Sequence, residues 1–352
     1  MKKILFPIVI FCISILCSCS SSTDNNGLVE NDHFTKWNAC EAIATLKAYV
    51  EDVTDPHSKN YIKEEDRIAT FDMDGTFVGE LYPTYFEYNL LEYRVLDDPS
   101  YKDKAPADVK EAAQDIRDFV RNGKKLPDHF DMKHAYAAAK AYAGMTLTEF
   151  DAYVKAYAAK PANGFKGMTY GQSFYKPMLQ VFDYLKANGF TFYVVSGSDR
   201  FICRALVESI GISPNRVIGM DVKLRTTKKG EVAGVNYTME KDEDLIRTDE
   251  LIIKNLKTNK VFQISQEIGK IPVISFGNSS GDCAMHNYCL SSPHRSVTFM
   301  LIADDEGRDH ANREKALKLG EQWREAGYHV ISMRDDFKTI YGEDVQKTDF
   351  TY

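Results

Sequence analysis

Two aspartates separated by a single residue follow directly on a short apolar run. The segment "RIATFDMDGTFVGE" covers residues 67–80 and contains Asp72 and Asp74. Carboxylates that lie so close repel each other, so they need either a cation that neutralises them or surroundings that separate their pKa values. The apolar run with its β-branched residues predicts a buried strand over residues 67–71. The pair therefore predicts a chemical site at the end of a strand.

The rest of the chain alternates between strand patterns and helix patterns. This alternation predicts the fold class α/β, with a doubly wound parallel sheet. Such sheets bind ligands at the carboxyl ends of their strands. A segment rich in Tyr and Ala between the first two strands is expected to be helical, and a hairpin is expected around residues 229–230. The expected strands cover 190–198, 216–222, 272–278, 296–304 and 328–333, and the expected helices include 37–53, 177–189, 199–211, 260–269 and 306–327.

Three strand ends carry polar, glycine-bearing loops with the residue types of a phosphoryl-transfer site. They are "DMDGT" after Phe71, "SGSD" after Val195 and "GNSSGD" after Phe276. Oxygen-only ligands favour a hard cation such as Mg²⁺. Hydroxyl groups, glycine N–H groups and a lysine suit a phosphate. A carboxylate nucleophile beside a second carboxylate for proton transfer suits an aspartyl-phosphate mechanism.

The segments "FDMDGT", "VVSGSD" and "SFGNSSGD", together with Lys260, resemble the four motifs of the haloacid dehalogenase superfamily of phosphohydrolases in their usual order. The resemblance covers nearly the whole mature chain. Segments such as "YKPMLQVFDYLKANGF" resemble an exported bacterial branch near the phosphoserine and phosphorylcholine phosphatases. The resemblance to the superfamily implies a Rossmann-like hydrolase core, residues 34–76 and 177–352, with a helical cap inserted at residues 77–176.

The resemblance also implies roles for individual residues. Asp72 would be the nucleophile, and Asp74 would protonate the leaving oxygen and then activate the water. The phosphoryl group would be held by Thr76, Ser196, Gly197 and Lys260. Lys254 and Lys257 compete with Lys260 for this position, but Lys260 directly precedes the helix that leads to the "SFGNSSGD" strand.

The expected metal is Mg²⁺, bound by Asp72, by Asp74 through its backbone carbonyl, and by the loop after Phe276. This loop departs from the family pattern, because Asn278 stands where the motif usually has an aspartate, and Asp282 follows four residues on. Either Asp282 is the direct ligand, or Asn278 is a neutral one that weakens metal binding.

The expected function is hydrolysis of a small phosphomonoester similar to phosphoserine or phosphorylcholine. Two alternatives stay open: transfer of the phosphoryl group to an alcohol, and binding of a phosphorylated ligand by a lipoprotein without turnover. The formal net charge of −7 and the short basic stretch at 223–229 argue against a nucleic-acid partner. Neither composition nor spacing indicates an oligomeric state.

The N-terminus has the pattern of an export signal. Lys2 and Lys3 precede an apolar run too short to span a bilayer, and small polar residues follow. "LCSC" resembles a bacterial lipoprotein processing site, which implies a signal peptide over residues 1–18, a lipid anchor at Cys19, a flexible tether over 19–33 and a periplasmic location. The remaining cysteines, Cys40, Cys203, Cys283 and Cys289, lack metal-ligand spacing and are expected to be buried thiols.

Several other residues allow both a structural and a functional interpretation. Glu80 either contacts substrate or cap, or is an exposed charge. Asp304, Asp305 and Arg308 follow another strand end and either buttress the site or form a surface ion pair or helix cap. Neither His286 nor His294 is expected to be catalytic. Aromatic residues of the inserted segment are expected to pack as a core, although a box for a quaternary ammonium group is the alternative: Tyr82, Tyr85, Phe86, Tyr170, Phe174 and Tyr175.

Overall fold

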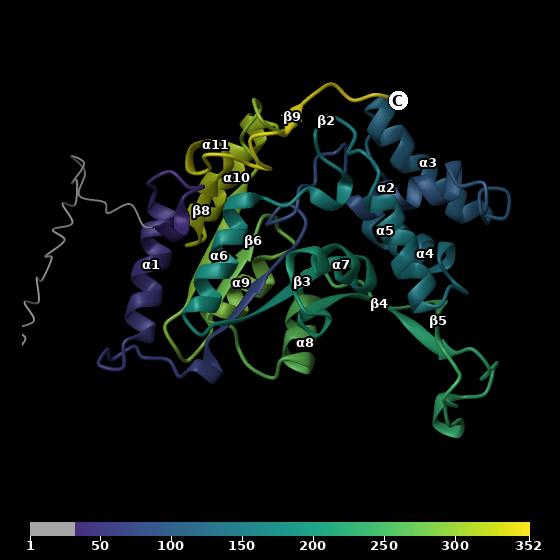
Figure 1. Cartoon of the computed structure of the whole chain (residues 1–352), viewed down its shortest axis with the longest axis horizontal. Helices are drawn as coiled ribbons and strands as arrows, with labels where there is room; N and C mark the ends of the chain where they lie inside the picture. The colour runs from purple at the N-terminus through teal and green to yellow at the C-terminus, as the bar shows by residue number, and fades with distance from the viewer. Residues whose placement is uncertain (1–31) are drawn as a thin grey trace, which may run out of the picture.

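A seven-stranded sheet forms the centre of the computed structural model, which describes residues 32–352 (Figure 1). The strand order is β5-β4-β3-β1-β6-β7-β8, and all neighbours pair in parallel except β4 and β5. This confirms the predicted α/β class and parallel sheet. The strands are β1 (Ile68–Phe71), β3 (Thr191–Asp199), β4 (Val217–Thr226), β5 (Leu245–Ile253), β6 (Ile274–Gly277), β7 (Val297–Ile302) and β8 (His329–Ser332).

Strand β1 lies in the middle of the sheet, between β3 and β6. All four of its residues are buried, as expected for an uninterrupted apolar run with parallel neighbours on both sides. Phe71 pairs in register with Val194 of β3 and Phe276 of β6, and its ring stacks on Phe276 with a centroid distance of 4.4 Å. The carboxyl ends of β1, β3 and β6 therefore meet at one edge of the sheet.

Helices cover both faces of the sheet. Successive side chains of a strand point to opposite faces of the sheet. The neighbouring residues Val194 and Val195 of β3 therefore reach different clusters: Val194 belongs to the main hydrophobic core. Val195 packs with Ile264 and Met285 in a separate cluster. The main core includes side chains of α1 (Glu41–Thr54), α6 (Lys176–Ala187) and α7 (Arg200–Val207). The opposite face is covered by α8 (Thr258–Glu267), α9 (Cys283–Leu290) and α10 (Arg313–Glu325).

A helical segment lies between β1 and β3 in the sequence and packs beside the far end of the sheet (Figure 1). Within it, α4 contacts β5, and α5 contacts α7. Its helices are α2 (Phe86–Glu92), which continues as a π-helical turn over Tyr93–Asp97, α3 (Ala107–Asn122), α4 (Phe130–Ala141) and α5 (Leu147–Ala158). The segment is helical as expected, and the domain boundaries themselves stay a prediction.

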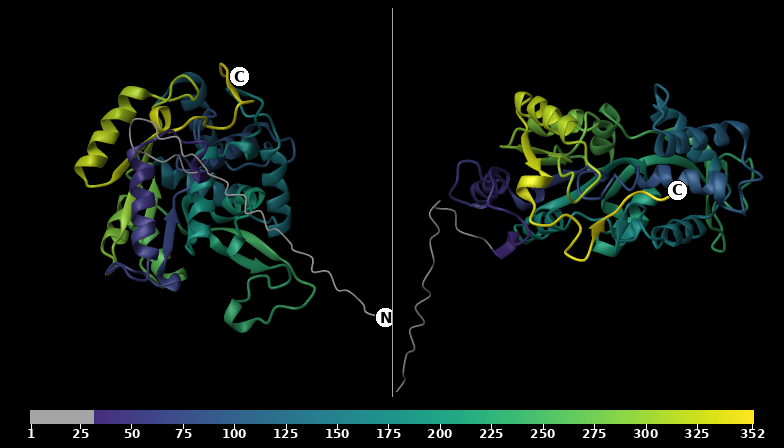
Figure 2. Two further views of the ribbon diagram at one scale, coloured as in Figure 1. Left: turned by 60° about the vertical axis from the view of Figure 1, so that its left-hand side comes forward. Right: turned by 90° about the horizontal axis from the view of Figure 1, so that it is seen from above.

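Two smaller features complete the fold. The loop between β4 and β5 projects away from the body of the molecule, in accord with the expected hairpin (Figure 2). A second sheet pairs β2 (Phe165–Lys166) with β9 (Gln346–Lys347), and a short helix α11 (Met333–Asp336) follows β8.

The predicted signal peptide, Cys19 and most of the predicted tether lie outside the described residues. The last two tether positions, residues 32 and 33, open a short 3-10 helix, Asp32–Phe34. Within residues 32–352 no helix combines the length and apolar character that crossing a membrane requires. The four cysteines of this range are free thiols; Cys203 and Cys289 are buried as expected, whereas Cys40 and Cys283 are only partly buried.

Candidate active site

A cavity of about 80 Å³ lies at the carboxyl ends of β1, β3 and β6. Core loops and the inserted helical segment both contribute to its wall. The core supplies Asp72, Asp74, Gly197, Ser198, Lys254, Leu256, Lys260, Asn278, Ser279 and Asp282, and the inserted segment supplies Tyr85, Glu87, Tyr88 and Asp131. The structure thus brings together six predicted site residues in its wall: Asp72, Asp74, Gly197, Lys260, Asn278 and Asp282.

Lys260 joins two of the carboxylates at the base of this cavity. Its Nζ donates to Asp72 Oδ1 at 2.5 Å and to Asp282 Oδ1 at 2.7 Å. Burial works against the charged ammonium, but the two carboxylates raise the pKa of Lys260 above its usual range. Lys260 therefore stays charged and fixes the position of Asp72.

Asp282 is occupied by protein donors on both oxygens. Beyond Lys260, its Oδ2 accepts hydrogen bonds from the backbone N–H groups of Asn278 at 3.1 Å and Ser279 at 3.0 Å. Although burial disfavours the charge, Lys260 and these donors lower the pKa of Asp282. These contacts are those of a residue that orients Lys260 and the loop after β6, and its predicted role as a metal ligand stays a prediction.

Asp72 lies at the cavity wall, where it accepts a hydrogen bond from Lys260. Burial and the nearby charge of Asp282 raise the pKa of Asp72 to about 6, while Lys260 acts in the opposite direction. The Thr76 hydroxyl lies 3.4 Å from Asp72 Oδ2. The turn between them requires a glycine, since Gly75 has φ of 79°. With a pKa of about 6, Asp72 is mostly ionised at neutral pH, as a nucleophile must be.

Asp74 has one oxygen bound and one oxygen without a partner. The Ser198 hydroxyl donates to Asp74 Oδ2 at 2.7 Å, whereas Asp74 Oδ1 is buried and has no hydrogen-bond partner among residues 32–352. Burial, together with the charges of Asp72 and Glu87, raises the pKa of Asp74 to about 7. A carboxyl group that titrates near neutrality suits a general acid and base.

The predicted phosphate-binding residues divide into two groups. Gly197 and Lys260 line the cavity, whereas Ser196 and Thr76 are buried beneath its wall. The Ser196 hydroxyl accepts a hydrogen bond from Ser198 N at 3.0 Å and so shapes the turn. A Cβ on Gly197 would lie 2.5 Å from Leu256 Cδ2, so a larger residue here would have to displace the Leu256 side chain.

A buried charge pair at the cavity wall was missed by the sequence analysis. Lys254 Nζ donates to Glu87 Oε1 at 2.9 Å, and the other Glu87 oxygen accepts from Asp199 N at 3.1 Å. His134 Nδ1 lies 3.6 Å from Glu87 Oε1. Although burial disfavours the charge, Lys254 and His134 help to lower the pKa of Glu87. In the sequence, Lys254 was marked only as an alternative to Lys260 for the phosphate-binding lysine. The residues around Glu87 form no pattern that indicates a functional site.

The aromatic residues of the inserted segment pack mainly as core, as expected. Among the six, only Tyr85 lines the cavity, where its ring lies against that of Tyr88 with a centroid distance of 5.3 Å. The other five are buried: Tyr82, Phe86, Tyr170, Phe174 and Tyr175. The ammonium box in its predicted composition is therefore not assembled.

The donor set near Asp72 has the chemistry that Mg²⁺ prefers. Asn278 lies at the cavity wall, and its Nδ2 donates to Glu80 Oε2 at 3.2 Å. Burial, with the charges of Asp74 and Asp72, raises the pKa of Glu80 to about 8. Within residues 32–352, no group of three or more His, Cys, Asp or Glu side chains is arranged to hold a metal. A fitting site would therefore combine carboxylate oxygens with amide and backbone carbonyl oxygens, which are hard ligands.

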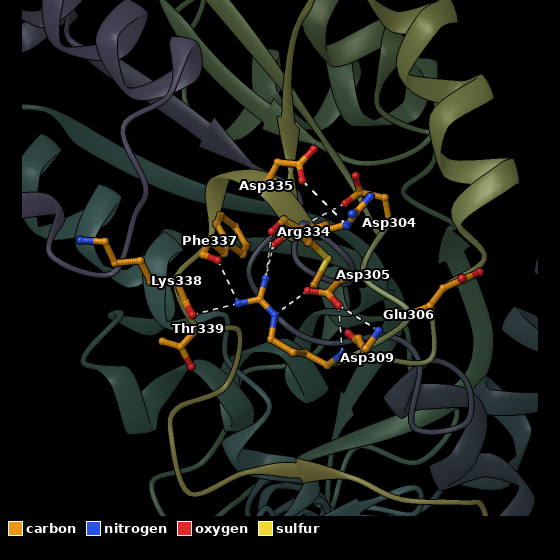
Figure 3. A network of polar contacts seen from close by, with 12 residues as sticks. Asp304, Asp305, Glu306, Asp309, Arg334, Asp335, Phe337, Lys338 and Thr339 are labelled. Atoms are coloured by element: carbon orange, nitrogen blue, oxygen red, sulfur yellow. Dashed lines mark hydrogen bonds and ion pairs between the residues drawn. The ribbon is translucent and has the colours of Figure 1, made fainter. Parts of the chain in front are cut away.

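The acidic loop after β7 has a structural role (Figure 3). Arg308 donates to Asp305 and to the backbone carbonyls of Phe337, Lys338, Met333 and Arg334, which ties this loop to the chain after β8. Asp304 accepts from the Ser332 hydroxyl at 2.6 Å and from Arg334 N at 3.0 Å.

The two histidines near the fourth motif have no contact with the cavity. His286 is buried, with Nδ1 2.7 Å from the Ser275 hydroxyl and Nε2 3.2 Å from the Phe299 carbonyl. His294 is exposed. Neither histidine belongs to the cavity wall.

Comparisons with known proteins reach only the level of the fold. No family model and no curated protein sequence matches the chain. A conserved protein of unknown function from Anaerococcus prevotii is similar in structure, with 15% identity, a TM-score of 0.51 and coverage of 86% of this chain and 94% of that one.

Two further solved structures are similar at lower scores. The first is cytosolic 5'-nucleotidase IIIB bound to cytidine, at 11% identity, a TM-score of 0.49 and coverage of 87% and 89%. The second is a phosphoserine phosphohydrolase-like protein from Francisella tularensis, at 13% identity, a TM-score of 0.39 and coverage of 75% and 94%. The sheet with its motif-bearing strand ends is the fold that the motifs implied, while the exported branch stays a prediction.

Proposed function

We propose that this protein is a Mg²⁺-dependent phosphomonoesterase that acts through an aspartyl-phosphate on a small phosphorylated metabolite. The observation that carries the proposal is the pair of neighbouring carboxylates with different surroundings. Asp72 is held by Lys260, whereas Asp74 has a pKa of about 7 and a buried oxygen that finds no partner within the described part of the chain. One carboxylate is thus suited to attack and the other to carry a proton.

In the first half of the proposed reaction, an Asp72 carboxylate oxygen attacks the phosphorus of the ester. A bond forms between this oxygen and phosphorus, and the bond between phosphorus and the ester oxygen breaks. Asp74, in its protonated form, gives its proton to the departing oxygen, so the product leaves as a neutral alcohol. Lys260 and the Gly197 turn face the cavity and would stabilise the negative charge on the phosphoryl group.

In the second half, water hydrolyses the aspartyl-phosphate. Asp74, now ionised, takes a proton from the water as its oxygen attacks phosphorus, and the bond to Asp72 breaks. Inorganic phosphate leaves, and both carboxyl groups return to their starting states. Mg²⁺, when bound by Asp72, the Asp74 backbone carbonyl and the Asn278–Asp282 loop, would supply positive charge that screens Asp72 from the incoming phosphate.

The test is phosphate release by the purified protein from a panel of phosphomonoesters, with and without Mg²⁺, beside Asp72→Asn. Activity that requires both Mg²⁺ and Asp72 would support the proposal. No phosphate release from any ester by folded protein would contradict it. A new ester formed when an acceptor alcohol is added would indicate phosphotransfer, and ligand binding without product would indicate a binding lipoprotein.

The proposal also includes an exported protein held to a bacterial membrane by lipid on Cys19. It rests on the N-terminal pattern alone. Mass spectrometry of the protein from its native membrane fraction would detect an acylated N-terminal Cys19, and a mature chain that begins elsewhere would contradict it.

A further inference from the structure

A second cavity, of about 380 Å³, lies on the inserted helical segment, beside Thr351 and Tyr352. It is larger than the cavity at the strand ends, and the two share no lining residue. Helix α2 contributes to both, because Glu87 lines the first cavity whereas Asn89 and Glu92 line the second. Small-molecule sites have volumes of roughly 300–1,000 Å³. The second cavity therefore has the size of a separate ligand site.

Asn89 offers this cavity an oxygen that has no hydrogen-bond donor. Its Nδ2 donates to the Tyr82 and Thr84 carbonyls, at 3.0 and 2.9 Å, so its two N–H groups are used. Its Oδ1 accepts from no group among residues 32–352. Asn89 is only 5% exposed, and it belongs to the cavity wall.

Glu92 repeats this arrangement three positions further along α2. Arg117 Nε and Arg121 Nη2 both donate to Glu92 Oε1, at 2.8 and 3.0 Å, and no group in the described part of the chain donates to its Oε2. Glu92 is 7% exposed and lies in the same wall as Asn89, on the same face of the helix. Buried acceptors without donors cost free energy. An ammonium group, with three N–H groups, would satisfy both oxygens.

Lys160 adds a charge of the opposite sign to the cavity wall. Its Nζ lies 3.3 Å from the centroid of the Tyr93 ring and 5.2 Å from that of Tyr157, and it forms no ion pair with any carboxylate of residues 32–352. Its N–H groups therefore remain able to donate to an anion. A ligand with an ammonium group alone would meet Lys160 as a like charge, so the ligand also needs an anionic group.

The remainder of the lining has mixed charge and much apolar surface. Two acids and two bases line the cavity, so neither sign dominates: Glu92, Asp97, Arg121 and Lys160. The apolar surface includes two buried tyrosine rings, Tyr157 and Tyr170, that stack with a centroid distance of 5.1 Å. Further apolar surface comes from Pro83, Val120, Pro161 and Tyr352. A ligand that carries both charges on an apolar body matches this lining.

We propose that this cavity binds a zwitterionic amino acid with an apolar side chain, whose ammonium group donates to Asn89 and Glu92 and whose carboxylate accepts from Lys160. The apolar side chain packs against the tyrosine rings. This inference goes beyond the proposed function and does not depend on it, because none of the lining residues belongs to the site at the strand ends.

The test is the binding of three probes to the full-length protein, measured by calorimetry and by ligand-observed nuclear magnetic resonance. The probes are L-phenylalanine, phenethylamine, which lacks the carboxylate, and 3-phenylpropionate, which lacks the ammonium group. We expect L-phenylalanine to bind with a dissociation constant of about 1 mM or lower. Each analogue should bind about tenfold more weakly, because it loses one set of charged hydrogen bonds.

Two variants assign the charges to residues. Glu92→Gln keeps the shape of the side chain but removes its charge, so the advantage of L-phenylalanine over 3-phenylpropionate should disappear. Lys160→Met removes the ammonium group, so the advantage over phenethylamine should disappear. The matched control is Asp98→Asn, since Asp98 is a buried acid paired with Arg94 that lines neither cavity. It should bind the three probes as the unmodified protein does, and melting curves would show that every variant is folded.

Three results would overturn the inference. They are no binding of L-phenylalanine at about 10 mM, an analogue that binds as tightly as L-phenylalanine, and an unchanged preference among the probes in folded Glu92→Gln or Lys160→Met. Binding is measured without a phosphomonoester, so the inference and the proposed function can fail separately. A protein that binds L-phenylalanine through Glu92 and Lys160 but releases no phosphate would keep the first and lose the second.

Discussion

Two acid-rich loops leave the same edge of the sheet, and they treat their carboxylates in opposite ways. The loop after β7 surrounds its acids with donors: Asp304 accepts from Ser332 and Arg334, and Asp305 accepts from Arg308 (Figure 3). In the loop after β1, Asp74 keeps a buried oxygen that has no partner among residues 32–352, and Asp72 shares the Lys260 ammonium with Asp282.

The difference teaches which acids are available for chemistry. A buried carboxylate without a full set of donors costs free energy, so a fold keeps one only where something else compensates for that cost. In the loop after β7, the carboxylates accept hydrogen bonds that hold this loop to the segment after β8. The loop after β1 leaves hydrogen-bonding capacity directed at a cavity, which is where a substrate or a cation can supply the missing partners.

The largest expected effect comes from removing the nucleophile. Asp72→Asn should lower phosphate release at least about 1,000-fold, because a neutral amide cannot form the aspartyl-phosphate. Asp305→Asn, in the structural loop, should retain activity within a few-fold of the unmodified protein. Initial rates of phosphate release measure both. Equal losses in the two variants would remove the distinction between the loops.

The next effect concerns the stability of the structural loop. Arg308→Met keeps the apolar stem but removes the contacts to Asp305 and to four backbone carbonyls. We expect the free energy of unfolding to fall by about 2–4 kcal/mol. Urea denaturation followed by circular dichroism gives this value. A change below about 0.5 kcal/mol would show that the loop is held by other contacts.

A smaller effect is expected in the pH dependence of activity. With a pKa of about 7, Asp74 loses the proton that the leaving group needs as the pH rises. We therefore expect kcat/KM to fall roughly tenfold for each pH unit above 7 if protonation of the leaving group limits the rate.

Ser198→Ala sharpens this test. It removes a donor that favours ionised Asp74, so the alkaline limb should move to higher pH. An alkaline limb that stays in place in Ser198→Ala would contradict the role of this contact. Thr298→Ala is a matched control, since Thr298 is a buried hydroxyl residue of β7 outside the cavity wall.

The smallest effect concerns Asp309, whose carboxylate accepts from Tyr341 and His310 N. Burial raises its pKa to about 6, above the unfolded value, so this group stabilises the fold at low pH and loses that contribution as the pH rises through 6. Asp309→Asn should therefore raise the free energy of unfolding by about 1 kcal/mol at pH 7.5, and the gain should shrink toward pH 5. Urea titrations at both pH values test this, and a loss of stability at pH 7.5 would contradict it.

The amino-acid sequence was enough to predict those parts of the fold and the site that depend on local sequence patterns. The buried strand before Asp72 and the polar loops at three strand ends could be predicted, because apolar runs and glycine-bearing turns are local features. The expected helix over 199–211 ends earlier, with α7 closing at Val207 and a 3-10 turn following. Helix α9 was missed, because it is only eight residues long and follows a polar loop without a marked apolar face.

Other parts of the site could not be predicted, because they depend on contacts between distant segments. Glu87 and Lys254 are 167 positions apart in the sequence, and neither lies in a recognisable motif. The choice between Asn278 and Asp282 also depended on tertiary structure, since only the folded loop shows that both Asp282 oxygens accept hydrogen bonds. The sequence allows Glu80 to be an exposed charge, whereas in the folded chain it accepts a hydrogen bond from Asn278, 198 positions away.

The Glu87 contact affects how the inserted segment can move relative to the core. The cavity of about 80 Å³ has both Glu87 and Lys254 in its wall. Glu87 belongs to α2, while Lys254 and the Asp199 amide belong to the core, so this contact ties the inserted segment to the core at the cavity wall. Any movement of the inserted segment away from the core therefore has to break this buried charge pair first.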